Sequence, residues 1–200
     1  MKTLILASNS PRRKSLFDQL SIPFRTESPG CIEPDSFYGE KPEDFACRCA
    51  LMKASEVALR YPESIVLGAD TIVVQDQTIL GKPHSAAEAE NMIRFLSGKE
   101  HFVITGVAFI RPSSEDIVSY SKTRVIFRNL SPEEIIWYTK TRDGLDKAGA
   151  YGIQSLGGFL VKEIHGDWFN VVGLPIPLIL DMLKLVDIWP PGKQNGYTDA

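Results

Sequence analysis

The segment Thr3-Leu4-Ile5-Leu6-Ala7-Ser8-Asn9-Ser10-Pro11-Arg12-Arg13 lies near the start of the chain and predicts its fold class. Its first half is rich in apolar residues, which favours a buried strand over residues 3–7. Ser10 and Pro11 are typical of a helix start, because serine is a common N-cap and proline fits the first helical position. The apolar face of this helix is formed by Leu16, Phe17 and Leu20. A strand, a loop and a helix in this order are typical of α/β proteins.

The remaining sequence continues with further strand and helix patterns. Strands are predicted over 64–68, 71–74, 101–110, 117–127 and 159–164, with a turn at Asp76-Gln77. Helices are predicted over 42–61, 85–98, from 131 onwards and over 175–188. The Gly-Ala-Asp-Thr segment 68–71 is interpreted as a junction between two short strands. Because no repeat or linker divides the chain, we expect one domain over residues 1–188 and a loose polar tail over 189–200.

The charge balance limits the kinds of ligand. The 22 Lys and Arg residues are outnumbered by 25 Asp and Glu residues, which gives a net charge of -3. A general nucleic-acid binder normally has a basic excess, so we expect no nucleic-acid partner. A pocket for a small anion needs only a few local cations and is compatible with this charge.

The expected location is a reducing cytosol. The apolar run at the N-terminus is too short for a signal peptide, and no stretch approaches the roughly 20 apolar residues of a membrane span. The cysteines Cys31, Cys47 and Cys49 form no regular disulfide framework. Cys47 and Cys49 also lack the spacing of a zinc site and are interpreted as small residues on a helix face. We therefore expect a cytoplasmic protein without membrane contact.

The loop from Ser8 to Arg13 is the first candidate for chemistry. A loop between a strand and a helix exposes backbone N–H groups and the positive end of the helix dipole. The hydroxyls of Ser8 and Ser10 and the guanidinium groups of Arg12 and Arg13 add donors that suit phosphate oxygens. The alternative interpretation is a capped helix with a solvated basic start.

Asp70 is the second candidate. It interrupts an apolar, β-branched stretch, where a carboxylate is costly unless it is paired or binds a metal. The small residues Gly68 and Ala69 beside it leave room for a ligand. The alternative interpretation is an aspartate in a turn between two strands.

Two lysines could serve the same ligand. Lys82 lies between Gly81 and Pro83 on a short, stiff segment that could direct its ammonium group at a polyphosphate, although the segment is not a P-loop. Lys53 shares one side of its helix with Phe45. Taken alone, Lys82 would be assigned to a surface turn and Lys53 to a side chain that extends into water.

Acidic side chains and one amide complete the set. Divalent cations such as Mg²⁺ prefer oxygen ligands. The candidate ligands, each of which could equally be solvated surface, are Glu33, Asp35, Glu40, Glu43 and Asp44. Gln154 follows a glycine-rich stretch and could read a base edge with one donor and one acceptor; the alternative is an irregular connector. Together, these features favour a nucleotide polyphosphate as the ligand.

In their order along the chain, these motifs resemble the Maf family of nucleoside triphosphate pyrophosphatases. The resemblance runs from roughly Leu4 to Leu185. It rests on Leu6-Ala7-Ser8-Asn9-Ser10-Pro11-Arg12-Arg13, Gly68-Ala69-Asp70-Thr71, Leu80-Gly81-Lys82-Pro83, Asp146-Lys147-Ala148-Gly149-Ala150-Tyr151-Gly152-Ile153-Gln154 and Val171-Val172-Gly173-Leu174-Pro175. Several long motifs in one order are far more specific than a single short pattern. The first and fourth of these segments are similar to the dTTP/UTP pyrophosphatase branch of the family.

The resemblance implies a fold, an activity and roles for particular residues. The implied Maf/ITPase-like fold is α/β, a mixed, strongly twisted sheet flanked by helices with two lobes around a central cleft, often in a homodimer. The implied enzyme is a hydrolase of nucleotide metabolism that needs a divalent cation, Mg²⁺ or Mn²⁺, and releases pyrophosphate. Asp70 is then the proton acceptor with a share in metal binding, and Glu33 is the other candidate metal ligand. Phosphate binding would fall to Ser8, Arg12, Arg13, Lys53 and Lys82, and substrate choice to Arg12, Thr71 and Gln154.

Two alternative functions stay open at this point. A nucleotide-sensing regulator of septum formation or growth would use the same pocket without essential turnover, although the presence of Asp70 and both lysines argues against it. A house-cleaning hydrolase would act on modified pyrimidine nucleotides. One departure from the family pattern also bears on substrate choice: Ser155 follows Gln154 where glycine is expected, which could redirect this loop.

Overall fold

The computed structural model describes residues 3–31, 34 and 39–189. Within these residues the strands are β1 (Leu4–Ala7), β2 (Arg25–Glu27), β3 (Ile65–Gln75), β4 (Thr78–Leu80), β5 (Glu100–Ile110), β6 (Ile117–Phe127) and β7 (Val161–His165). They form one seven-stranded sheet in the order β2-β1-β3-β5-β6-β7, with β4 paired to β3. β1 runs parallel to β2 and β3, and the other pairs are antiparallel. The predicted mixed sheet is confirmed.

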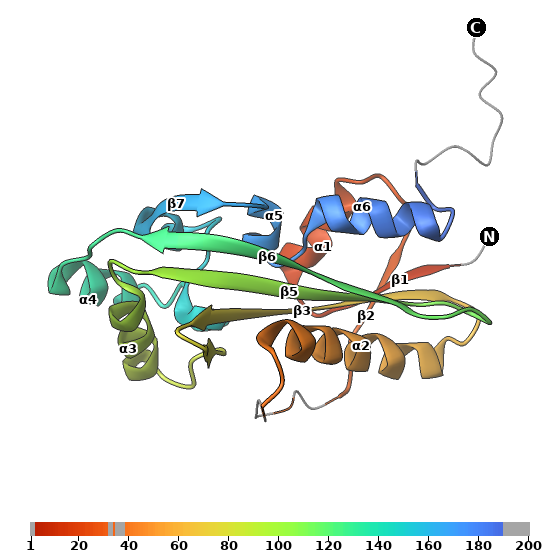
Figure 1. Cartoon of the computed structure of the whole chain (residues 1–200), viewed down its shortest axis with the longest axis horizontal. Helices are drawn as coiled ribbons and strands as arrows, with labels where there is room; N and C mark the ends of the chain where they lie inside the picture. The colour runs from red at the N-terminus through yellow and green to blue at the C-terminus, as the bar shows by residue number, and fades with distance from the viewer. Residues whose placement is uncertain (1–2, 32–33, 35–38, 190–200) are drawn as a thin grey trace, which may run out of the picture.

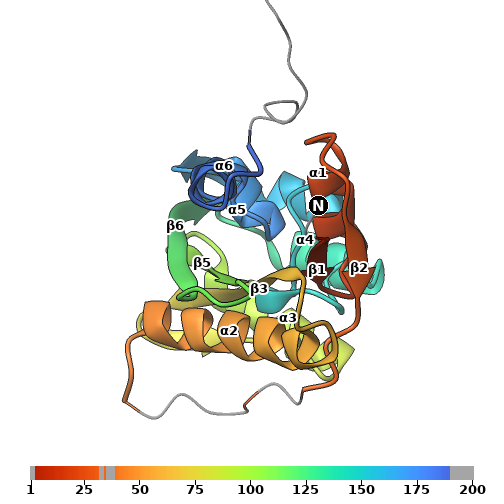
Figure 2. The same cartoon turned by 90° about the vertical axis from the view of Figure 1, so that its right-hand side faces the viewer.

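Helices cover both faces of this sheet. They are α1 (Pro11–Asp18), α2 (Pro42–Arg60), α3 (Ala86–Leu96), α4 (Pro132–Lys140), α5 (Trp168–Val172) and α6 (Ile176–Leu185), with short 3-10 helices η1 (Ala148–Ala150) and η2 (Leu156–Leu160). α2 packs on one face, whereas α1, α5 and α6 lie on the other, as Figure 1 and the end-on view in Figure 2 show. α3 and α4 contact each other at one end of the sheet. No described helix is long and apolar enough to cross a membrane.

The first strand, loop and helix follow their sequence signals. All four residues of β1 are buried. The side chain of Ser10 accepts a hydrogen bond from the backbone N–H of Arg13, and Pro11 is the first helical residue, so the predicted helix start is confirmed. Leu16 and Phe17 pack in an apolar cluster that also contains residues of β1 and α6. This packing fixes the loop over residues 8–10 at the end of β1.

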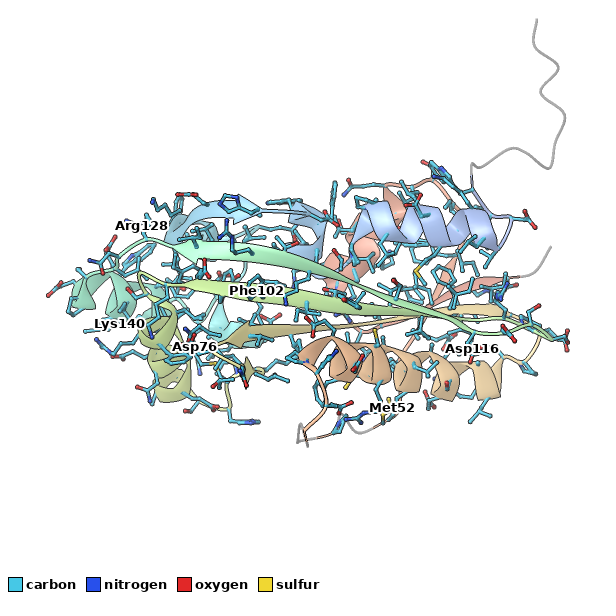
Figure 3. All side chains as sticks on the ribbon, viewed as in Figure 1. Met52, Asp76, Phe102, Asp116, Arg128 and Lys140 are labelled. Atoms are coloured by element: carbon cyan, nitrogen blue, oxygen red, sulfur yellow. The ribbon has the colours of Figure 1, made fainter. Side chains whose placement is uncertain are left out.

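β3 is one continuous strand, and the prediction of two short strands joined at residues 68–71 is wrong. Residues 66–74 pair with β5 without interruption, and Asp70 is the register partner of Gly106. Small and polar residues in the middle suggested a junction, but ladder hydrogen bonds and packing outweigh that local preference. The turn predicted at Asp76-Gln77 is confirmed, because positive φ values of 48° and 66° close a two-residue hairpin to β4. Figure 3 shows Asp76 at this end of the sheet, far from Asp116 at the other.

Two short strands and one short α-helix escaped prediction, as did the 3-10 helices η1 and η2. β2 and β4 contain three residues each, and α5 contains five. Segments of this length are too short for an apolar period to be recognised. α6 also covers only Ile176–Leu185 of the predicted span 175–188.

Candidate active site

An open cleft of about 1200 Å³ lies against the middle of β3. Its walls come from the loop after β1, from α2, the middle of β3, the segment after β4, and residues 146–155. The predicted site residues that line it are Ser8, Arg12, Arg13, Lys53, Asp70, Thr71, Lys82 and Gln154. Glu33 and Asp35, two of the predicted metal ligands, lie outside the described residues. Segments far apart in the sequence are therefore brought to one surface.

An ion pair between Asp70 and Lys53 lies in this cleft. Nζ of Lys53 is 2.5 Å from Oδ1 of Asp70. Only 12% of the Asp70 side chain and 9% of the Lys53 side chain are exposed. A pair with this little exposure holds both groups in place, because separating them would leave a charge unpaired in a poorly solvated site. Lys53 therefore binds a carboxylate and does not extend into water.

Close packing of α2 on the sheet brings these two side chains together. A Cβ atom added to Gly68 would lie 2.3 Å from the carbonyl oxygen of Ala50, and one added to Gly106 would lie 2.2 Å from that of Ala46. Neither position has room for a side chain, so the helix rests directly on the backbone of β3 and β5. Gly106 is the register partner of Asp70. The absence of side chains at these two positions thus lets the α2 lysine reach the β3 carboxylate.

Hydrogen bonds of Arg13 connect the start of α1 with β3 and with the residue that ends α5. Its Nε donates to the carbonyl oxygen of Gly173 at 2.8 Å, its Nη1 to that of Ala69 at 2.8 Å, and its Nη2 to the hydroxyl of Thr71 at 2.9 Å. The Thr71 hydroxyl in turn lies 3.3 Å from the carbonyl oxygen of Gly173. Ala69 and Thr71 flank Asp70 on β3. The start of α1 is therefore tied to β3 at both neighbours of Asp70 and to Gly173 at the end of α5.

Arg12 and Lys147 both form ion pairs with Asp146 in the cleft. Its Nη1 lies 2.8 Å from Oδ2 of Asp146, and Nζ of Lys147 lies 2.7 Å from Oδ1 of the same carboxylate. Burial acts to raise the pKa of Asp146, but hydrogen bonds from Lys147 and Arg12 outweigh it and lower the pKa to about 2. Asp146 was not among the predicted site residues, because no sequence signal indicates a partner 134 positions away.

Lys82 and Ser8 approach the cleft from two other segments. Lys82 is exposed and follows β4. The backbone of its neighbour Gly81 accepts a hydrogen bond from the N–H of Gly149 at 3.0 Å, which ties this segment to η1. Ser8 follows β1, and its hydroxyl accepts a hydrogen bond from the N–H of Ser10 at 3.1 Å. An ammonium group and a hydroxyl from two separate sequence motifs thus line the cleft.

Gln154 occupies a tight turn in the cleft wall. The N–H of Ser155 donates to the carbonyl oxygen of Gly152 at 3.3 Å, so Ile153 and Gln154 are the two central residues of the turn. Ile153 packs against the apolar cluster of β1 and α6. Gln154 is exposed and lines the cleft. The serine at position 155, in place of the glycine expected there, has therefore not directed the loop away from the cleft.

Carboxylates are sparse in the described part of the cleft. No group of three or more His, Cys, Asp and Glu side chains gathers into a metal site among residues 3–31, 34 and 39–189. Two predicted metal ligands have other partners, because Glu40 pairs with Arg48 and Glu43 pairs with Lys122. The acidic residues that line the described cleft are Asp70, Glu88 and Asp146. Cys47 and Cys49 lie on α2, as predicted.

Sequence comparisons with known proteins support the family resemblance of the motifs. A protein of Symbiobacterium thermophilum named dTTP/UTP pyrophosphatase is 49% identical over 183 residues, which cover 92% of this chain and 93% of that protein. One of the same name from Bacillus cytotoxicus is 48% identical over 187 residues, covering 94% and 97%. Among solved structures, the Staphylococcus aureus Ham1 protein matches with a TM-score of 0.44 and 15% identity over 74% of this chain and 85% of that chain. A family model described as Maf-like protein matches residues 3–186, and with nearly half of all residues identical to such relatives, the chain belongs to the Maf family.

Proposed function

We propose that the protein hydrolyses dTTP and UTP to the corresponding monophosphates and pyrophosphate. The observation that carries the proposal is the Asp70–Lys53 pair in a cleft that Arg12, Arg13 and Lys82 also line. A carboxylate fixed by one lysine and surrounded by further cations offers a proton acceptor beside a binding site for a polyphosphate. The dTTP/UTP pyrophosphatase names of relatives at 49% and 48% identity support the choice of substrate.

In the proposed reaction, a water molecule attacks the α-phosphorus of the triphosphate. A new P–O bond forms to the water oxygen, the bridging P–O bond breaks, and pyrophosphate leaves. Asp70 accepts the proton of the attacking water, and Lys53 keeps the carboxylate in place. Ser8, Arg12 and Lys82 bind phosphate oxygens, which positions the chain for attack.

Lys82 and Arg13 are proposed to stabilise the departing pyrophosphate. Three hydrogen bonds, to Gly173 and to the two residues that flank Asp70 on β3, already fix the guanidinium group of Arg13. A charge that is held in place before the reaction stabilises developing negative charge without a cost of reorganisation. Lys82 is exposed on its short segment and can adjust to the outer phosphates.

A divalent cation, Mg²⁺ or Mn²⁺, is part of the proposal. Mg²⁺ in nucleotide sites commonly uses one or two protein carboxylates together with phosphate oxygens of the substrate. The Asp70 carboxylate in the cleft fits this donor chemistry, with Glu33 as the second ligand predicted from the sequence. When bound, such an ion would neutralise phosphate charge and make a water molecule more acidic.

Product analysis tests the proposed function directly. Purified protein would be incubated with Mg²⁺ and, separately, dTTP, UTP, CTP, GTP, ATP and a methylated pyrimidine triphosphate. We expect dTTP and UTP to be cleaved fastest, with one pyrophosphate released per monophosphate. Orthophosphate and nucleoside diphosphate as products would contradict cleavage of the α–β linkage. Tight nucleotide binding without any product would favour the nucleotide-sensing regulator instead.

Replacing Gln154 with alanine is expected to narrow the preference for UTP over CTP. Uracil and thymine present a ring N–H beside two carbonyls, which one amide can match with a donor and an acceptor, whereas cytosine presents an amine at one of these places. A mismatched partner costs about 1–3 kcal/mol, so the wild type should prefer UTP by about tenfold to more than a hundredfold in kcat/KM. The variant should lose much of this ratio through slower UTP hydrolysis, and a partial loss would assign the remainder to Arg12 and Thr71.

The matched control for this variant is Gln19→Ala, at the C-terminal end of α1 and outside the cleft lining. It should retain the wild-type ratio of kcat/KM values. Equal cleavage of UTP and CTP by the wild type, or an unchanged ratio in Gln154→Ala, would show that Gln154 does not read the base.

A further inference from the structure

One carboxylate oxygen organises the loop that carries Gln154. Oδ2 of Asp143 accepts hydrogen bonds from the hydroxyl of Ser155 at 2.7 Å and from the N–H of Gly157 at 3.2 Å. The Tyr138 hydroxyl lies 3.2 Å from the same oxygen and 3.2 Å from the carbonyl oxygen of Ala150. Asp143 follows α4, and only 16% of its side chain is exposed. Hydrogen bonds to an ionised carboxylate are stronger than those between neutral groups. Asp143 is therefore the polar anchor of residues 155–157.

The bonds to Asp143 hold the chain immediately after Gln154, where the turn over residues 152–155 ends. The Ser155 hydroxyl has a single proton, and its two possible acceptors are the Asp143 carboxylate at 2.7 Å and the carbonyl oxygen of Gly152 at 3.2 Å. The shorter distance and the negative charge favour the carboxylate. The backbone N–H of Ser155 meanwhile closes the turn onto Gly152 at 3.3 Å. Both the hydroxyl and the backbone N–H of Ser155 are thus hydrogen-bonded.

The residues before Gln154 are anchored in the core. Tyr151 is buried, and its hydroxyl lies 2.8 Å from Nε2 of His101. Burial lowers the pKa of His101 to about 4, so this contact is between neutral groups at neutral pH. Ile153 packs with the cluster of β1 and α6. Gln154 is therefore an exposed residue whose backbone is fixed on both sides, by apolar packing before it and by Asp143 after it.

We propose that Asp143 is a positioning residue for base selection: through Ser155 and Gly157 it holds the turn that presents Gln154 to the nucleotide base. This inference rests on the proposed function, because it adds a support to the amide that reads the base. Groups that discriminate between ligands must be held to within about 0.5 Å, and the residues around them provide that precision. A loosened turn lets the Gln154 amide take several orientations, which lowers the preference for the matching base more than it lowers turnover.

The test compares Asp143→Asn, Ser155→Ala and Ser155→Thr with the wild type. The first two should reduce the ratio of kcat/KM for UTP to that for CTP by about tenfold, with a smaller fall in kcat. Ser155→Thr keeps the hydroxyl and should retain the wild-type ratio. The loss of selectivity in the double variant Asp143→Asn/Ser155→Ala should be less than the sum of the two single losses, because both changes weaken the contact between Ser155 and Asp143. The matched control is Asp181→Asn, which replaces an exposed carboxylate on α6 and should leave the ratio of kcat/KM values unchanged.

Hydrogen–deuterium exchange of the peptide covering residues 151–158, in the ligand-free protein, gives a second readout that needs no activity. Exchange should be faster in Asp143→Asn and Ser155→Ala and unchanged in Asp181→Asn. A lower melting temperature with an unchanged ratio would mean a merely structural role and would overturn the proposal. Unchanged exchange in both variants would also overturn the proposal. If Asp143→Asn fails to fold, the selectivity ratio and the exchange rate of Ser155→Ala alone decide the test.

Failure of the proposed function is visible in the wild type alone. A wild type that releases no pyrophosphate from any triphosphate would remove the function on which the inference depends. A wild type that cleaves UTP and CTP equally would overturn base selection by this loop while leaving the hydrolase activity intact. A selective wild type with equally selective Asp143 and Ser155 variants would overturn the positioning role only.

Discussion

Asp70→Asn is expected to lower kcat for UTP hydrolysis by about a thousandfold, because loss of a general base typically costs between a hundredfold and ten thousandfold. The substitution keeps the size of the side chain and one oxygen acceptor near Lys53, but it removes the charge that accepts the proton. KM should change much less than kcat, since the cations that are proposed to bind the triphosphate remain. Steady-state kinetics with UTP, together with calorimetric binding of a non-hydrolysable analogue, would separate these two effects.

The same substitution also weakens a buried ion pair, so the fold of the variant must be measured with its rate. Breaking such a pair can destabilise a protein by about 3–5 kcal/mol. Circular dichroism and the melting temperature would show whether the variant is folded at the assay temperature. Asp76→Asn is the matched control, because Asp76 follows the same strand (Figure 3) and is not among the residues that line the cleft. A folded Asp70→Asn protein that keeps more than a tenth of the wild-type kcat would exclude Asp70 as the proton acceptor.

Removal of divalent cations with EDTA is expected to reduce the activity to the background rate. A triphosphate carries several negative charges, and a metal ion commonly shares the task of neutralising them with lysine and arginine side chains. Readdition of Mg²⁺ or Mn²⁺ in excess over the chelator should restore full activity, because oxygen donors such as Asp70 suit either ion.

The control for chelation is the melting temperature of the same samples. An unchanged value with lost activity assigns the ion to the reaction, whereas a lower value assigns it to the fold. Full activity after exhaustive chelation, followed by gel filtration into metal-free buffer, would refute the requirement for a cation.

The sequence predicted most of the elements because their signals were local. Ser10 and Pro11 mark the start of α1, and a long run with helical periodicity marks α2. β3 was divided in error because Gly68 and its neighbours have low strand propensity, and only the arrival of α2 on that face explains why small residues stand there. The cause lies in another element of the chain, so a local pattern could not reveal it.

For the site, too, local sequence patterns predicted residue types but not the contacts between distant residues. The cations and Asp70 were identified as residue types suited to a polyphosphate, and the structure places them in one cleft. Their partners were not predicted, because the bonds of Arg12 to Asp146 and of Lys53 to Asp70 join positions 134 and 17 residues apart. Asp143 resembles an ordinary turn residue in the sequence, and nothing local connects it with Gln154. The homodimer, the cytoplasmic location and the roles of individual site residues stay predictions.

The two glycines beneath α2 set a limit on transplanting this site into another protein. A designer who copied Asp70 and Lys53 onto a different strand and helix would copy the charges without the narrow gap between them. With ordinary side chains at the positions of Gly68 and Gly106, the helix would stand farther from the sheet, and the lysine would no longer reach the carboxylate. A transplanted site must therefore reproduce the short distance between the helix backbone and the sheet backbone. That distance depends on glycine, which has no side chain, at both positions.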